Sequence, residues 1–173
     1  SSAASDVYKR QDFARIENDR RDGRDYAFLE GFGQSAPMVL LDALGARAGT
    51  PLPALLASGG VRHPYDVVRG LALGARAVGV AGTFLHAVLA EDPAGSAGPV
   101  APDGAERLTA LIRAWTERLR ELCALLGART PAELTRTDVL VEGRLAHAAA
   151  LRGADLAALA ARSETTAFEE DPA

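Results

Sequence analysis

The fold is decided by a short glycine-containing stretch, LLASGGVR, at residues 55–62. Apolar residues without polar alternation over 54–57 predict a strand that is buried on both faces. Gly59 and Gly60 then form a turn, since glycine adopts backbone conformations that other residues avoid, and Pro64 suits the first position of a helix. A strand, a glycine turn and a helix start direct backbone N–H groups at one point, where phosphate is the usual ligand.

A second strand end follows close behind. Apolar residues at helical spacing over 67–75 predict a helix, which Gly74 ends. AVGVA at 77–81 predicts another buried strand, closed by Gly82. Two strands joined by a helix of about three turns form a parallel crossover. Their ends then share one edge, where the candidate phosphate-binding residues are Gly59, Gly60, Val61, Arg62, Ala81 and Gly82. Converging strand-end loops of this kind are typical of an α/β barrel; the alternative is two ordinary strand-to-helix turns.

Bulk composition excludes several classes of function. The 173 residues, 48% hydrophobic and 24% charged, suit one globular domain or a piece of a larger one. A net charge of −4 gives no sign of a nucleic-acid partner, and no apolar run reaches the roughly 18 residues of a membrane helix. The lone Cys123 argues against disulfides and fits a reducing cytoplasm.

The remainder of the chain is predicted to be largely helical. Capping boxes at Asp103/Glu106 and Thr130/Glu133 open two helices, and the first of these places Trp115 and Cys123 in the core. Residues 139–141 predict a short strand and 144–153 a last helix. We expect residues 1–11 to be a non-native leader derived from a cloning adaptor, 12–162 to be the native domain, and 163–173 to be a disordered tail.

Other candidate residues are weaker. Glu17 lies in a charged loop and could transfer protons or hold a cation, but composition alone favours a solvated charge run. His63 adjoins the phosphate turn and suits a helix cap better than a base. No spacing that would bind a metal links it to His86 or His147.

Outside residues 1–11, the chain resembles the carboxyl-terminal half of the type 2 isopentenyl-diphosphate isomerases, a flavin-dependent family of (β/α)8 barrels. The matching pieces, in order, are FARIE (13–17), FGQS (32–35), ASGGVR (57–62), DVV (66–68), LALGA (71–75), VGVAG (78–82), LIRAW (111–115) and LGA (126–128). Other flavin barrels share GGVR (59–62) and the LGA at 73–75, whereas ARIE (14–17) and the Trp115 helix with its LGA end (126–128) are more particular to the isomerases.

The resemblance implies a fold and an activity. The fold is the last part of a TIM barrel followed by a helical tail. The family interconverts isopentenyl and dimethylallyl diphosphate, a step of isoprenoid biosynthesis, with reduced FMN, Mg²⁺ and NADPH as reductant, and forms homo-oligomers. Residues 59–62 with Ala81 and Gly82 would hold the FMN phosphate. Glu17 would be a proton-transfer residue and Phe13 a substrate neighbour.

The resemblance also implies that much of the site lies outside this chain. The metal ligand, the substrate-diphosphate ligands and most flavin contacts belong to the family's other half, so no metal ligand is predicted here. We therefore expect the chain alone to be inactive and poorly soluble, because an incomplete barrel keeps open strand edges. Two alternatives stay open: another FMN barrel, such as a 2-hydroxy-acid oxidase with a catalytic histidine, and a non-catalytic helical interaction module.

Overall fold

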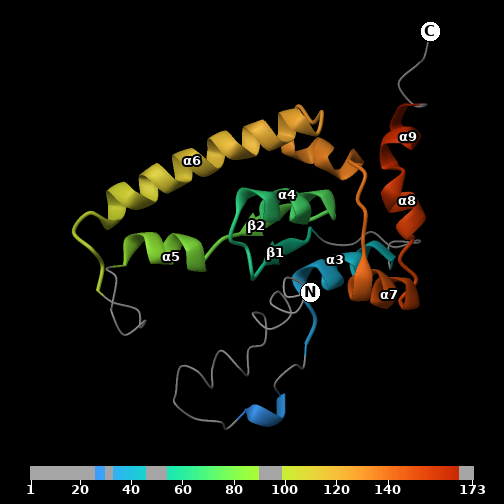
Figure 1. Ribbon diagram of the computed structural model, residues 1–173, viewed down its shortest axis with the longest axis horizontal. Coiled ribbons are helices and arrows are strands. Elements are labelled where there is room, and N and C mark those ends of the chain that lie inside the picture. The colour runs from blue at the N-terminus through green and yellow to red at the C-terminus, as the bar shows by residue number, and fades with distance from the viewer. Residues whose placement is uncertain (1–25, 30–32, 46–53, 90–98, 168–173) are drawn as a thin grey trace.

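The structure, a computed structural model, describes residues 26–29, 33–45, 54–89 and 99–167 (Figure 1). Within these ranges the chain forms one two-stranded parallel sheet with helices packed against one of its faces, the α/β arrangement that the sequence predicts. In chain order the elements are η1 (Ala27–Leu29), α3 (Ala36–Gly45), β1 (Leu56–Ser58), α4 (Pro64–Ala72), β2 (Ala77–Gly79), α5 (Gly82–Val88), α6 (Gly104–Leu125), η2 (Pro131–Arg136), α7 (Gly143–Leu151), α8 (Leu156–Ala160) and α9 (Arg162–Ala167).

The predicted parallel crossover is confirmed in the unit β1–α4–β2. The two strands pair in parallel, with Leu56 opposite Ala77 and Ser58 opposite Gly79. β1 begins and ends later than the predicted strand, and β2 ends before the predicted boundary at Ala81. The chain turns away from the ladder directly after Ser58, so β2 loses its partner beyond Gly79.

The prediction that the first strand is buried on both faces is wrong. Side chains alternate between the two faces of a strand, and only the face with Ala57 and Val78 packs against α4. A Cβ built at Gly70 of α4 would lie 2.8 Å from Val78 Cγ2, so helix and strand approach as closely as a glycine allows. Leu56, on the other face, is 75% exposed, because no described residue covers that face.

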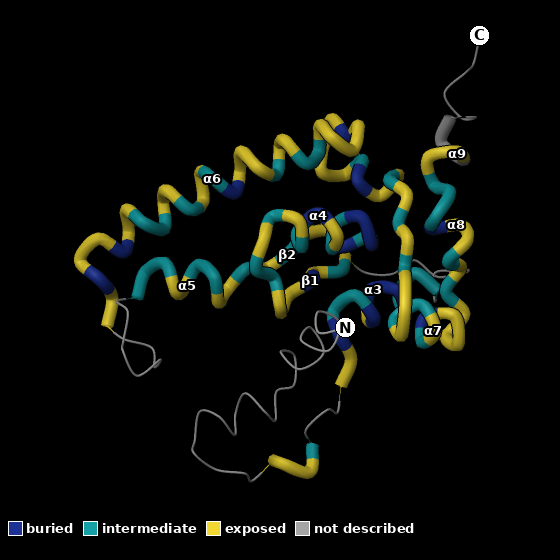
Figure 2. Tube along the Cα trace, viewed as in Figure 1, coloured by how far each residue is buried: buried dark blue, intermediate teal, exposed yellow. Residues whose placement is uncertain are grey.

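The main core lies between β1, the end of α4, and helices α3, α7 and α8. Leu41 of α3 and Ala149 of α7 are fully buried there. The Ser35 hydroxyl accepts a hydrogen bond from the backbone N–H of Met38 at 3.4 Å, so Ser35 opens α3 as an N-cap. Figure 2 shows these buried segments clustered beside the sheet, with the exposed residues around them.

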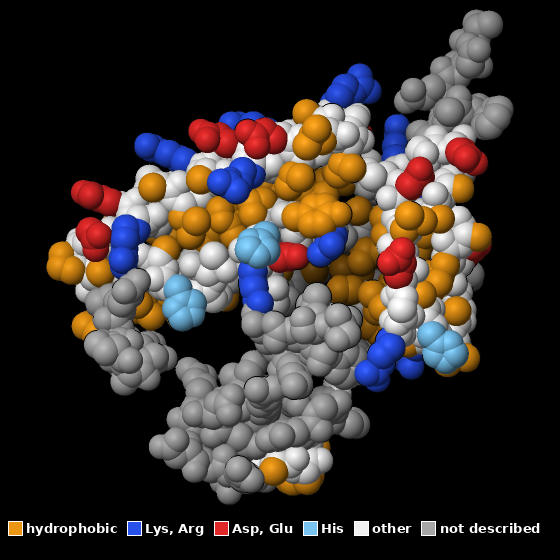
Figure 3. All heavy atoms as spheres, in the orientation of Figure 1, with side chains coloured by type: hydrophobic (Ala, Val, Ile, Leu, Met, Phe, Trp, Pro, Cys, Tyr) orange, Lys and Arg blue, Asp and Glu red, His pale blue; other side chains and the backbone are white. Residues whose placement is uncertain are grey.

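The long helix α6 lies along α5 and α4. Trp115 is only 7% exposed, as predicted, and meets the Phe84 ring of α5 edge-on with centroids 5.3 Å apart. Cys123 is partly buried beside Val68 and Leu134. Figure 3 shows charged side chains on the outer side of α6 and hydrophobic ones between α6 and α4. The capping box predicted at Asp103 does not form, since its carboxylate pairs with Arg107 at 3.7 Å instead.

The carboxyl-terminal segment differs from expectation in two places. Residues 139–141 are not a strand; the backbone N–H of Val139 instead donates to the carbonyl of Leu159 at 2.8 Å. Residues 163–167, placed by the sequence in an irregular tail, continue α9 to Ala167. The Asp138 carboxylate accepts hydrogen bonds from the backbone and hydroxyl of Ser163 at 2.8 and 2.7 Å, which holds the start of this helix. Residues 168–173 lie outside the described residues.

Candidate functional site

The turn after β1 requires glycine at two successive positions. Gly59 has a φ of 95° and Gly60 a φ of 72°, a left-handed conformation that side chains with a Cβ disfavour. Both glycines are exposed at the end of the strand. Backbone can therefore approach a bulky ligand here without an intervening side chain.

The loop after β2 meets this turn at the same edge of the sheet. Ala81 is the N-cap of α5, and Gly82 is its first residue. A Cβ built at Gly82 would meet no other heavy atom within 4 Å, so the space beside it is open. The Thr83 hydroxyl donates to the carbonyl oxygen of Val61 at 3.3 Å, which ties the start of α5 to the glycine turn.

The start of α4 fixes the other end of the turn. His63 is the N-cap residue and Pro64 the first helical residue, as the sequence predicts. The Asp66 carboxylate oxygen Oδ2 accepts hydrogen bonds from the backbone N–H groups of Arg62 and His63, at 3.0 and 3.1 Å. Arg62 is half-buried, and its backbone is thus fixed from within the helix that follows.

The structure brings together the six residues predicted to bind phosphate. Residues 59–62 and Ala81–Gly82 follow neighbouring parallel strands whose last pair is Ser58 with Gly79, and the bond between Thr83 and Val61 joins the two loops. Exposed glycine backbone beside an arginine suits an anion with several oxygens, because N–H groups and a guanidinium all donate to it. The residues present therefore fit a phosphate group.

The other candidate residues are the two in the amino-terminal loop and the three histidines. Phe13 and Glu17, like residues 1–11, lie outside the described residues. All three histidines are exposed, at the N-cap of α4, on α5 and on α7. Within the described ranges, no three His, Cys, Asp or Glu side chains are grouped to hold a metal ion.

Two residues of the site were not assigned to it from sequence. In the sequence, Asp66 indicates only the first turn of a helix, and Thr83 indicates only the start of a short helix. The position of Asp66, three residues after His63 and two after Pro64, is a local signal for a carboxylate that reaches back to the cap. The Thr83 bond joins residues 22 positions apart, and no local pattern indicates it.

The described helices include none with the length and apolar character needed to span a membrane. Even α6, with 22 residues, carries charged side chains along its length.

Comparison with known proteins gives one family and a consistent set of relatives. The model of the family described as FMN-dependent dehydrogenase matches residues 33–141. A protein of Streptomyces sp. (strain CL190) is 49% identical over 164 residues, which cover 94% of this chain and 40% of that protein. A protein of Nocardia farcinica is 49% identical over 151 residues, which cover 87% of this chain and 37% of that protein. A protein of Listeria innocua is 40% identical over 150 residues, which cover 87% of this chain and 38% of that protein.

All three relatives are named isopentenyl-diphosphate delta-isomerase. The predicted resemblance is therefore confirmed. The chain spans about two fifths of the length of these curated relatives. The matched region, 33–141, contains both loops of the candidate site and the whole β1–α4–β2 unit.

Proposed function

Because this chain belongs to the FMN-dependent dehydrogenase family, we propose that it is the carboxyl-terminal part of an FMN-binding (β/α)8 barrel. The parallel β1–α4–β2 unit supports this proposal, since such a barrel repeats that unit around its axis. The uncovered face of β1, with Leu56 75% exposed, is the face that would line the barrel interior against the remaining strands.

The loops after β1 and β2 bind the FMN phosphate in this proposal. Gly59, Gly60 and Val61 supply backbone from one side and Ala81 and Gly82 from the other, while the Arg62 guanidinium donates to phosphate oxygens. The single observation that carries the proposal is the hydrogen bond from Thr83 to Val61, which brings the two loops to one point. Bound FMN supplies the flavin ring; the residues of this chain anchor and orient it.

The activity of the whole protein is proposed to be the interconversion of isopentenyl and dimethylallyl diphosphate. Its relatives carry the name of that isomerase at 38–49% identity. Reduced FMN, with NADPH as reductant, and Mg²⁺ complete the proposed cofactors, and Glu17 and Phe13 remain the proposed proton-transfer and substrate residues. We also propose a cytoplasmic homo-oligomer.

The two alternatives differ in what they require. A 2-hydroxy-acid oxidase needs a catalytic histidine near the flavin, and the sequence upstream of this chain would discriminate it from the isomerase. A helical interaction module requires no convergence of the two strand ends, whereas Val61 and Thr83 are hydrogen-bonded. The hydrogen bond favours a flavin barrel over the interaction module, and the names of the relatives favour the isomerase.

Flavin binding is best tested in this chain joined to the amino-terminal remainder of the Streptomyces relative, which would complete the barrel. We expect the joined protein to retain FMN and to isomerise isopentenyl diphosphate with FMN, a reductant and Mg²⁺. Arg62→Ala should weaken FMN binding by roughly tenfold or more, since a charge-assisted phosphate contact is lost. The matched control is Arg129→Ala, whose side chain is 85% exposed and lies outside both loops.

The chain alone provides a second test. It should show no turnover under the same conditions, because it spans only about two fifths of its relatives. Isomerisation by the chain alone would contradict the proposal that part of the active site lies outside this chain. A loss of FMN affinity in Arg129→Ala as large as in Arg62→Ala would contradict the proposal that Arg62 binds the FMN phosphate.

A further inference from the structure

We propose that Asp66 is a positioning residue for phosphate recognition by the turn at residues 59–62. Its carboxylate holds the backbone of Arg62 and His63, so that the Arg62 side chain and the glycine backbone face the anion. The proposal rests on the proposed FMN site and adds to it a residue that need not touch the ligand.

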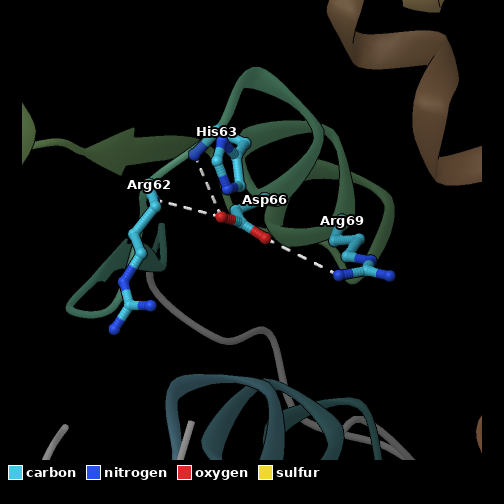
Figure 4. Close-up of polar contacts among 4 residues, drawn as sticks. All are labelled: Arg62, His63, Asp66 and Arg69. Carbon is cyan, nitrogen blue, oxygen red and sulfur yellow. Dashed lines mark hydrogen bonds and ion pairs between the residues drawn. The ribbon is translucent and has the colours of Figure 1, made fainter. Parts of the chain in front are cut away.

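The hydrogen bonds of Asp66 define this role. One oxygen, Oδ2, accepts from Arg62 N at 3.0 Å and from His63 N at 3.1 Å. Hydrogen bonds to a carboxylate are stronger than those between neutral groups. Figure 4 shows the consequence for Arg62: its backbone N–H points at Asp66, while its guanidinium extends away from Asp66 and from α4.

The same bonds decide which backbone groups are left for a ligand. The amino terminus of a helix attracts anions, and in α4 the Asp66 carboxylate already takes that place. The N–H groups of Arg62 and His63 are bonded to it, so in this proposal they do not donate to a bound phosphate. Asp66 thereby directs the anion from α4 toward the space beside Gly82.

A negative charge next to a phosphate site needs a counter-charge, and α4 supplies one. Arg69 Nη1 lies 3.6 Å from Asp66 Oδ1, and the Arg69 guanidinium carbon lies 4.2 Å from the centre of the Tyr65 ring. The ion pair drawn in Figure 4 places Arg69 beside Asp66, one turn along the helix. The repulsion between Asp66 and a bound phosphate is reduced accordingly.

The test compares FMN with riboflavin, which has the same ring and no phosphate, in the joined protein described above. The ratio of their dissociation constants isolates phosphate recognition from folding and from ring binding. Asp66→Ala should reduce the preference for FMN by roughly tenfold, since the turn loses two charge-assisted bonds. Asp66→Asn keeps an acceptor oxygen and should restore the preference to within about threefold of the parent.

Glu133 provides a matched control, because it performs the same local task at another helix. Its carboxylate accepts from the backbone N–H of Arg129 at 2.9 Å, at the start of η2. Glu133→Ala should leave the FMN preference unchanged. An unchanged preference in Asp66→Ala would overturn the inference, as would an equal loss in Glu133→Ala. A parent protein that binds FMN and riboflavin equally would overturn the proposed phosphate site itself.

Discussion

The hydroxyl of Thr83 donates a hydrogen bond to the backbone carbonyl of Val61 at 3.3 Å, across the two loops that follow the parallel strands. The bond places the first turn of α5 against the glycine turn of residues 59–62. Two loops that are 22 residues apart in sequence thereby present their backbone at one point. The candidate phosphate site depends on this contact between loops as much as on the glycines themselves.

Removal of this contact should weaken FMN binding without unfolding the protein. Thr83→Val keeps the branched shape and removes the donor, and we expect FMN affinity to fall by a few-fold, about the effect of one part-buried hydrogen bond. Thr83→Ser retains the hydroxyl and serves as the control. FMN titration monitored by flavin fluorescence measures both; equal affinities in the two variants would contradict the role of the contact.

Two glycines at helix starts should differ in how much an alanine substitution lowers the free energy of unfolding. A Cβ built at Gly104 would lie 2.5 Å from the backbone carbonyl oxygen of Val88, so α6 would have to move away. Gly104→Ala should lower the free energy of unfolding by about 1–3 kcal/mol. Gly82→Ala should not, because a Cβ there meets nothing within 4 Å. Urea denaturation measures the free energy of unfolding of both variants. An equal loss of unfolding free energy in the two would contradict the close packing of Gly104 against Val88.

Helix α3 offers a buried and an exposed residue for comparison. Leu41 is fully buried in the main core, whereas Val39 is 48% exposed two positions earlier. Leu41→Ala should cost about 3–5 kcal/mol of unfolding free energy through lost burial and a cavity. Val39→Ala should change it by less than about 1 kcal/mol. A comparable loss in both variants would mean that α3 packs with a different face.

The contact between Asp138 and Ser163 should depend on pH. Hydrogen bonds from the Ser163 backbone and hydroxyl lower the pKa of the Asp138 carboxyl below its ordinary value. A lowered pKa in the folded protein means that the contact is fully present above the ordinary value, about 3.9. It is lost only as the pH falls through the lower, folded pKa.

The Ser163 amide resonance reports this titration. Its midpoint should lie below the ordinary pKa of aspartate, and Asp138→Asn should abolish the transition. A midpoint at or above the ordinary value would contradict the hydrogen-bonded arrangement.

The parallel unit and most helices could be predicted from sequence because their signals are local. Pro64 and the glycine turn each act within a few residues, and each formed the predicted boundary. Burial was harder to predict. Leu56 belongs to an apolar run that looked buried, yet its exposure depends on which segments cover the sheet, and no local pattern contains that information. The capping box predicted at Asp103 does not form, because the Asp103 carboxylate pairs with Arg107, one turn away.

The site shows the same division between local and long-range signals. Gly59, Gly60, Arg62 and Gly82 were found because glycine and arginine are the residue types that phosphate binding needs. Asp66 and Thr83 each hold backbone rather than ligand; the position of Asp66 after the His63 cap is a local signal, whereas the Thr83 contact is seen only in three dimensions. Sequence thus indicated candidate groups for contact with an anion, and the structure added those that hold the backbone of these candidates in place.

Amide chemical shifts would show whether these two loops bind the phosphate of FMN. This chain would be isotopically labelled within the joined protein, and shifts with FMN compared with those with riboflavin. We predict that phosphate-dependent changes are concentrated at residues 59–62 and 81–83 and are lost in Arg62→Ala. Phosphate-dependent changes confined to other parts of the chain, with residues 59–62 unmoved, would contradict the account.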